Sequence, residues 1–123
     1  MKKSLFILLA VVATFIASCS KDAKINRRID GEWKVVSIGG ATLTADETIT
    51  FKFAKDKKEN GDGTITYTYN NQSDVEAFTY VVSSGKITMM YSGYADILTV
   101  SKYERKKVEL IDSDGEIWVL DPK

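Results

Sequence analysis

The sequence predicts an all-β domain, an antiparallel eight-stranded up-and-down barrel, that follows a short N-terminal export segment. Two observations lead to this fold class. Runs of alternating apolar and polar residues recur between residues 32 and 121, and turn-forming residues separate them at short intervals. No segment between the runs is long enough for a crossover helix, so neighbouring strands are expected to pair antiparallel. A chain of 123 residues supports one such domain.

The first element is the export segment. Lys2 and Lys3 precede an apolar run, residues 5–17, in which Thr14 is the one polar residue. A basic start and an apolar run of this length are typical of a secretory signal, and the run is shorter than the ~20 residues of a membrane span. At its end, Ile16-Ala17-Ser18-Cys19 resembles the lipobox of bacterial lipoproteins. The resemblance implies that the Cys19 thiol receives a diacylglyceryl group and that cleavage occurs just before it.

Three parts of the chain follow from this interpretation: a signal peptide (1–18), a lipidated tether (19–26) and a barrel domain (27–123). The tether is predicted to be polar and flexible, so that the lipid at Cys19 holds the domain close to a membrane. We therefore expect the protein in the bacterial cell envelope, anchored to the outer membrane. Ser20-Lys21-Asp22 partly resembles the acidic export signal of surface lipoproteins of the Bacteroidetes, and periplasmic or surface orientation stays open.

The strands come next. The period-two runs predict strands over 32–38, 47–54, 63–70, 74–83, 86–91, 95–102, 106–111 and 116–121. Gly61-Asp62-Gly63 and Asn70-Asn71 are interpreted as turns, and Asp114-Gly115 as the turn of the last hairpin. A two-sheet sandwich is the alternative architecture. The barrel is favoured because closing the sheet removes its edges.

The start of the first strand carries a second resemblance. Gly31-Glu32-Trp33 is similar to the Gly-x-Trp motif of the lipocalins, and residues 27–121 resemble the small lipocalin-like domains of Bacteroidetes lipoproteins. The resemblance implies that Trp33 fills the closed end of the barrel and that Gly31 allows a tight entry. The last strand has no arginine, has Trp118 at its middle, and is not followed by a long helix. These departures imply a smaller ligand cavity than a lipocalin has.

Composition excludes several kinds of chemistry. The chain has no histidine and one cysteine, which excludes a Ser-His-Asp triad, a histidine-ligated metal and an internal disulfide. Seventeen basic and seventeen acidic residues give no basic footprint for nucleic acid. Residues 112–116 begin like a calcium loop but fit a hairpin turn better. We expect no catalytic residues, no metal, no cofactor and no enzymatic activity.

The aromatic side chains leave two interpretations open. The candidate lining of a ligand pocket is Phe51, Phe53, Tyr67, Tyr69, Phe78 and Tyr80. They either fill the core, since an eight-stranded barrel is just wide enough for side chains, or line a pocket for a small apolar or amphipathic ligand. The first case predicts an envelope structural or protein-interaction module with an unspecified protein partner. The second predicts a non-enzymatic binding protein.

Overall fold

The computed structural model describes residues 21–123, so the predicted signal peptide, the lipobox and Cys19 lie outside the described residues. Residues 21–29 are helical, and nine strands follow. The strands are β1 (Gly31–Ile38), β2 (Ala41–Thr42), β3 (Glu47–Lys57), β4 (Asn60–Tyr69), β5 (Gln72–Ser83), β6 (Lys86–Met90), β7 (Ala95–Glu104), β8 (Lys107–Ile111) and β9 (Ile117–Pro122).

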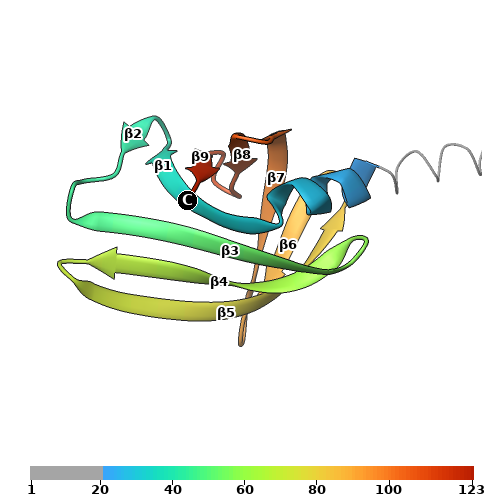
Figure 1. The fold of residues 1–123 in the computed structure, drawn as a ribbon, viewed down its shortest axis with the longest axis horizontal. Coiled ribbons are helices and arrows are strands. Elements are labelled where there is room, and N and C mark those ends of the chain that lie inside the picture. The colour runs from blue at the N-terminus through green and yellow to red at the C-terminus, as the bar shows by residue number, and fades with distance from the viewer. Residues whose placement is uncertain (1–20) are drawn as a thin grey trace, which may run out of the picture.

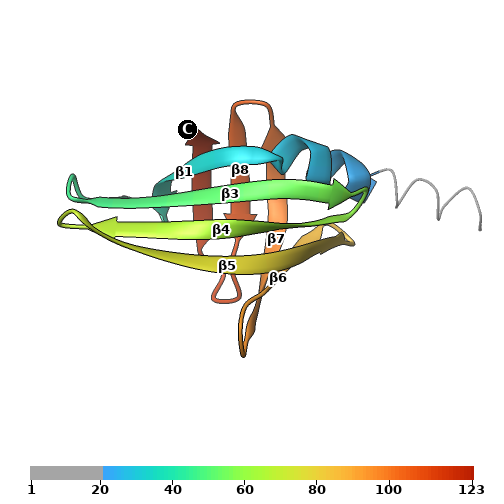
Figure 2. The same cartoon turned by 60° about the horizontal axis from the view of Figure 1, so that its bottom comes forward.

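The strands form a closed, antiparallel, up-and-down barrel of eight strands, which confirms the predicted fold class. Each strand from β3 to β9 pairs with the next, and β9 closes the sheet by pairing with β1 from Trp33↔Pro122 to Ile38↔Trp118. The two-residue strand β2 is extra and pairs with the end of β1. Figures 1 and 2 show β3, β4 and β5 running together across the front, with β7, β8 and β9 crossing behind them.

All eight predicted strands are present, with ends that shift by up to three residues. Asn70 and Asn71 form the predicted β4–β5 turn with φ of 49° and 65°, the left-handed conformation that two-residue hairpins need. The interpretation of Gly61-Asp62-Gly63 as a turn is wrong, because these residues lie inside β4, where Gly61 pairs with Lys55 and Gly63 with Phe53.

Alternation along the strands places one set of side chains inside the barrel. The core contains sixteen buried hydrophobic side chains, fourteen from the strands and two from the helix. Aromatic rings from β3 and β5 meet at its centre, where Phe53 lies edge-on to both Phe78 and Tyr80 at centroid distances of 5.7 and 5.4 Å. Edge-on ring packing adds to the free energy of burial, so these rings stabilise the middle of the barrel.

The helix corrects the prediction of a flexible tether over 19–26. Residues 21–26 are helical, and the buried positions Asp22, Ile25, Asn26 and Ile29 follow the i, i+3, i+4, i+7 spacing of one helix face. Ile25 and Ile29 are fully buried in the same cluster as Trp33. The helix is ordered because this face covers one end of the barrel (Figure 1).

Within residues 21–123, no helix is both long enough and apolar enough to cross a membrane.

Candidate functional site at the open end of the barrel

The two ends of the barrel differ because the helix covers only one of them. The β3–β4, β5–β6 and β7–β8 turns lie at the helix end, since consecutive turns of an antiparallel meander alternate between ends. The connections over 39–46, 70–71, 91–94 and 112–116 lie at the other end, which we call the mouth.

Polar side chains of the helix fasten it to the turns at the helix end. The Asp22 carboxylate accepts hydrogen bonds from the backbone N–H groups of Ser84 and Gly85, both at 2.9 Å. The Asn26 amide donates to the carbonyl oxygens of Lys57, Lys58 and Asn60.

The predicted floor residues lie at this end as well. Trp33 is 4% exposed, and its indole Nε1–H donates to the Ile29 carbonyl at 2.8 Å. Gly31 has a φ of +126°, a conformation that side-chain-bearing residues rarely adopt, so the turn from the helix into β1 needs glycine. Together with the helix, Trp33 closes the barrel at this end.

A cavity of about 190 Å³ opens at the mouth. Strands β3, β4, β6, β7 and β9 and the β8–β9 turn contribute to it. Its lining consists of Phe51, Ile65, Met89, Tyr91, Asp96, Ile97, Leu98, Asp112, Ser113, Asp114 and Trp118. The volume is below the ~300–1,000 Å³ of a typical ligand pocket, so the cavity accepts a ring or one end of a longer molecule.

Aromatic side chains form much of the cavity wall. Phe51 and Trp118 meet edge-on with their ring centroids 6.1 Å apart. Tyr91 stacks on Tyr94 at 4.7 Å and also packs against Phe78 at 5.7 Å. Aromatic faces carry partial negative charge and attract cations, so this wall suits an apolar group or a positively charged one.

Carboxylates surround the same opening, and no lysine or arginine lines it. Asp96 projects from the inward-facing side of β7, because it pairs with the buried Met89. Glu76 occupies an inward position of β5 opposite Ile65, and it accepts a hydrogen bond from the Tyr94 hydroxyl at 2.8 Å. Asp112 and Asp114 come from the β8–β9 turn.

Two groups at the mouth, the Asp112 carboxyl and the Tyr91 phenol, are held in defined protonation states. The hydrogen bond from the Trp118 indole, 2.9 Å, and those from turn N–H groups lower the pKa of Asp112 and keep it a carboxylate. Burial raises the pKa of the Tyr91 phenol well above its ordinary value, and the charge of Asp96 adds to this. Tyr91 is therefore a neutral hydroxyl at physiological pH.

The predicted pocket residues divide between three places. Phe53, Phe78 and Tyr80 are core, with exposed fractions of 1–3%, and the buried Phe51 is the one member of the set that lines the mouth cavity. Tyr67 and Tyr69 pair with Ile49 and Glu47, but they are 40% and 48% exposed because β3, β4 and β5 extend beyond the barrel there. The core interpretation therefore holds for the barrel centre.

The sequence prediction missed the acidic residues of the mouth. Asp74 and Glu76 share the strand parity of Phe78 and Tyr80, although both are exposed at the mouth end of β5. The signal was present in this i, i+2 spacing, which places acidic and aromatic residues on one face of the strand.

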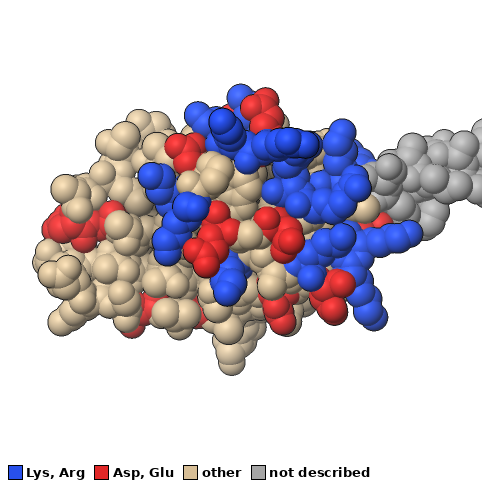
Figure 3. All heavy atoms as spheres, viewed as in Figure 1, with Lys and Arg blue, Asp and Glu red and all other residues tan. Residues whose placement is uncertain are grey.

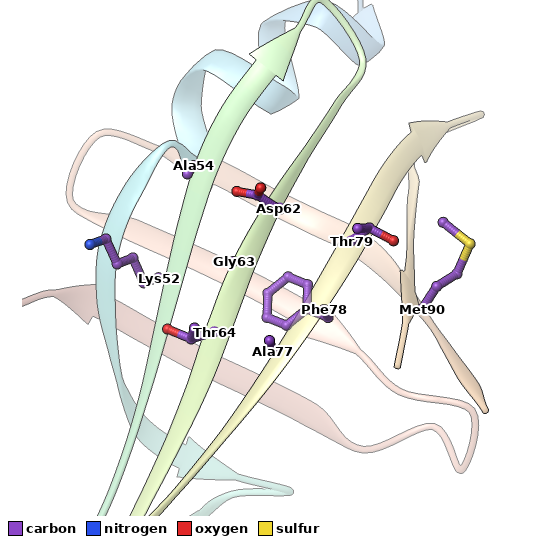
Figure 4. Close-up of a pocket in the computed structure, with 9 residues that line it drawn as sticks. All are labelled: Lys52, Ala54, Asp62, Gly63, Thr64, Ala77, Phe78, Thr79 and Met90. Carbon is purple, nitrogen blue, oxygen red and sulfur yellow. The ribbon is translucent and has the colours of Figure 1, made fainter. Parts of the chain in front are cut away.

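A larger hollow of about 560 Å³ lies on the outside of the barrel, across β3, β4 and β5 (Figure 4). Its rim carries exposed residues such as Lys52, Asp62 and Thr79, and the surface is hollow there because Ala54 and Ala77 have small side chains. No set of polar groups converges on it, so the mouth is the better candidate for a binding site.

No cluster of three or more side chains suited to holding a metal ion occurs in residues 21–123. Comparison of the chain with protein-family profiles, curated protein sequences and solved structures returned no significant match.

Proposed function

We propose that this protein is a non-enzymatic, lipid-anchored, lipocalin-like binding protein of the bacterial envelope, attached to the outer membrane. Its ligand is a small amphipathic molecule that inserts an apolar end into the mouth cavity and carries a positive charge. The observation that carries the proposal is an aromatic cavity bordered by Asp96, Asp112 and Asp114, with no basic residue in its lining.

The charge of the ligand follows from the carboxylates. Neither Asp96 nor Asp114 forms an ion pair among the described residues, where the two pairs are Lys102–Glu109 and Lys123–Glu32. Carboxylates at the rim of a low-dielectric cavity favour a cation and disfavour an anion. Aromatic rings at the same place favour an organic cation, because a cation over a ring face gains roughly 0.5–2 kcal/mol.

The ligand test compares phenethylammonium with phenylacetate, which share an aromatic ring and carry opposite charges. We expect the ammonium compound to quench Trp118 fluorescence at concentrations at least tenfold lower, with Trp33→Phe removing the other indole signal. Asp96→Asn is expected to weaken ammonium binding about fivefold, consistent with ~1 kcal/mol for one close charge. Asp62→Asn, on the outer face, is the matched control. Equal binding of the two compounds, or binding of neither, would contradict the proposal.

The anchor test is the Cys19→Ala variant. It is expected to lose incorporation of labelled fatty acid and to accumulate at the mass of the uncleaved chain, because the thiol is the acylated group. Ser20→Ala is the control and is expected to be labelled normally. Labelling that persists in Cys19→Ala would show that the lipid is attached elsewhere or that the lipobox interpretation is wrong.

A second candidate function rests on apolar side chains exposed around the mouth. Tyr94, Ile97 and Ile117 are 51%, 53% and 42% exposed, and Val75 is 64% exposed. Exposed apolar residues gathered at one end of a small domain are typical of a protein-interaction surface. In this case the barrel is a rigid envelope module that presents its mouth to a protein partner, and crosslinking from Tyr94 in intact membranes would identify that partner.

A further inference from the structure

Basic residues are concentrated toward the helix end of the molecule. Of the fifteen lysines and arginines of residues 21–123, Lys34 and Lys52 lie at mid-strand, and the others lie in the helix, in or near the turns at the helix end, or at the C-terminus. None lies in the four connections of the mouth. Figure 3 shows them over the helix, the neighbouring turns and the middle of the molecule, and none at the far tip of β3–β5. We call the helix end the basic pole because basic residues outnumber acidic ones there, whereas the connections of the mouth carry acidic residues and no basic ones.

Within the basic pole, a groove of about 520 Å³ lies between the helix and the β7–β8 turn. It is lined by Lys24, Arg27, Arg28, Asp30, Glu32, Trp33, Arg105 and Pro122. The chain has three arginines in all, and the groove contains all three, although Arg105 is 77 residues beyond Arg28 in the sequence. The fourteen lysines are spread more widely, so the arginines are placed differently from basic residues in general.

The cations of the groove have no carboxylate partners within the described part of the chain. The two ion pairs found there do not involve Lys24, Arg27, Arg28 or Arg105. The two acids of the groove are engaged elsewhere: Asp30 accepts a hydrogen bond from the backbone N–H of Lys55 at 3.0 Å, and Glu32 pairs with Lys123 at 3.6 Å. The guanidinium donors are thus free to bind an external anion.

We propose that this groove binds the phosphate of an anionic membrane lipid and docks the helix end of the barrel on the membrane. Guanidinium groups present paired N–H donors that match phosphate oxygens, which is the reason for arginine rather than lysine at such sites. The membrane is the source of the phosphate because Cys19 is two residues before Lys21, so their Cα atoms lie within ~8 Å of each other. The orientation rests on the proposed lipidation of Cys19.

Docking by the basic pole also determines where the mouth faces. The acidic residues of the mouth are repelled by an anionic surface, whereas the basic pole is attracted, so both ends favour the same orientation. The ligand cavity then opens away from the membrane, toward the aqueous compartment.

The test measures arginine modification by phenylglyoxal, read by mass spectrometry on the purified lipidated protein in vesicles. The vesicles contain phosphatidylcholine alone or phosphatidylcholine with phosphatidylglycerol. One basic side chain near an anionic surface strengthens binding roughly fivefold, so we expect the four groove cations together to slow modification of Arg27, Arg28 and Arg105 at least tenfold in the anionic vesicles. Equal modification in both kinds of vesicle would overturn the proposal.

Paired variants separate the groove from the general charge of the pole. Lys24→Gln/Arg105→Gln is expected to abolish the protection of Arg27 and Arg28. Lys55→Gln/Lys57→Gln removes the same charge from exposed positions at the same end, outside the groove, and is expected to keep most of the protection. Equal loss of protection in both variants would show that the attraction to the membrane depends on general charge, and this would overturn the proposal of a specific groove. All four side chains are exposed, so the variants are expected to fold.

Two further arms identify the source of the phosphate and the role of the anchor. Inorganic phosphate added to the detergent-solubilised protein is expected to give little protection, and full protection would indicate a soluble phosphate ligand instead of a membrane. If Cys19 carries no lipid, the protein is mixed with the same vesicles from solution. Flotation with anionic vesicles and arginine protection would then support the groove although the anchor had failed.

Discussion

Replacing Asn26 by leucine is expected to lower the free energy of unfolding by about 3–5 kcal/mol, because several buried polar groups lose their partners at once. Asn26 is fully buried. Its amide nitrogen lies 2.9, 3.2 and 3.1 Å from the carbonyl oxygens of Lys57, Lys58 and Asn60. Its carbonyl oxygen accepts the Tyr80 hydroxyl at 2.6 Å. Leucine has nearly the same volume and satisfies none of these groups.

The measurement is urea unfolding followed by far-ultraviolet circular dichroism, with a thermal melt. A domain of about 100 residues loses roughly 4–8 °C of Tm per kcal/mol, so the variant is expected to melt at least 12 °C lower. Arg27→Gln, at the next and exposed helix position, is the control and is expected to stay within ~0.5 kcal/mol. An Asn26→Leu protein as stable as the parent would show that the helix is not part of the cooperative barrel.

Asn26→Asp distinguishes lost hydrogen bonds from lost packing. The aspartate retains the acceptor for Tyr80 but places a negative charge against three carbonyl oxygens, so its pKa in the folded state is raised. A folded-state pKa above the unfolded value of ~3.9 means that the variant is most stable at acidic pH and loses stability as the pH rises. The parent is expected to show no such loss between pH 5 and 7, and a parallel profile would contradict the role given to Asn26.

The barrel could be predicted from sequence because its evidence is local. A strand with one buried face shows alternating apolar and polar residues in its own sequence, as in residues 48–53. Asn70-Asn71 indicates a hairpin turn because asparagine tolerates the left-handed conformation that the turn needs. The helix was missed for the opposite reason. Its short apolar face, Ile25 and Ile29, is interrupted by polar residues whose partners are 31 to 63 positions away in the chain.

For the candidate site, the kinds of residue were predicted from sequence better than their places in the fold. Trp33 and Gly31 occupy the closed end as expected, and Phe51 reaches the mouth. The basic groove depends on a contact between segments 77 residues apart, Arg28 and Arg105, that no local pattern reveals. The net charge near zero likewise gave no sign that the helix end is rich in basic residues and that the mouth is acidic. Which turns share an end of the barrel depends on the direction of each strand, and the net charge does not contain that information.

The second large effect is expected from Gly63→Ala, which should lower the free energy of unfolding by about 2–4 kcal/mol because the added methyl group has no space. A Cβ at residue 63 would overlap the Lys52 carbonyl oxygen and would lie 2.8 Å from Cζ of Phe78. Figure 4 shows the Phe78 ring beside this part of β4. Gly61 is similar: a Cβ added there would overlap the Ala54 carbonyl oxygen and would lie 2.8 Å from the Tyr80 hydroxyl. Both positions therefore need glycine, because the carbonyl oxygens of β3 and the aromatic rings of β5 approach them closely.

Alanine in place of a strand glycine ordinarily stabilises by about 0.5–1 kcal/mol, so the sign of the effect identifies the cause. Thr64→Ala, at the adjacent outward-facing position, is the control and should change the free energy of unfolding by less than 1 kcal/mol in urea. In a double-mutant cycle, Phe78→Leu should recover part of the Gly63→Ala loss, because a shorter side chain relieves the contact with the ring but not the contact with the carbonyl. Strictly additive losses would show that the ring does not limit residue 63. A stabilised Gly63→Ala protein would show that the space beside residue 63 accommodates a methyl group and would contradict the close approach.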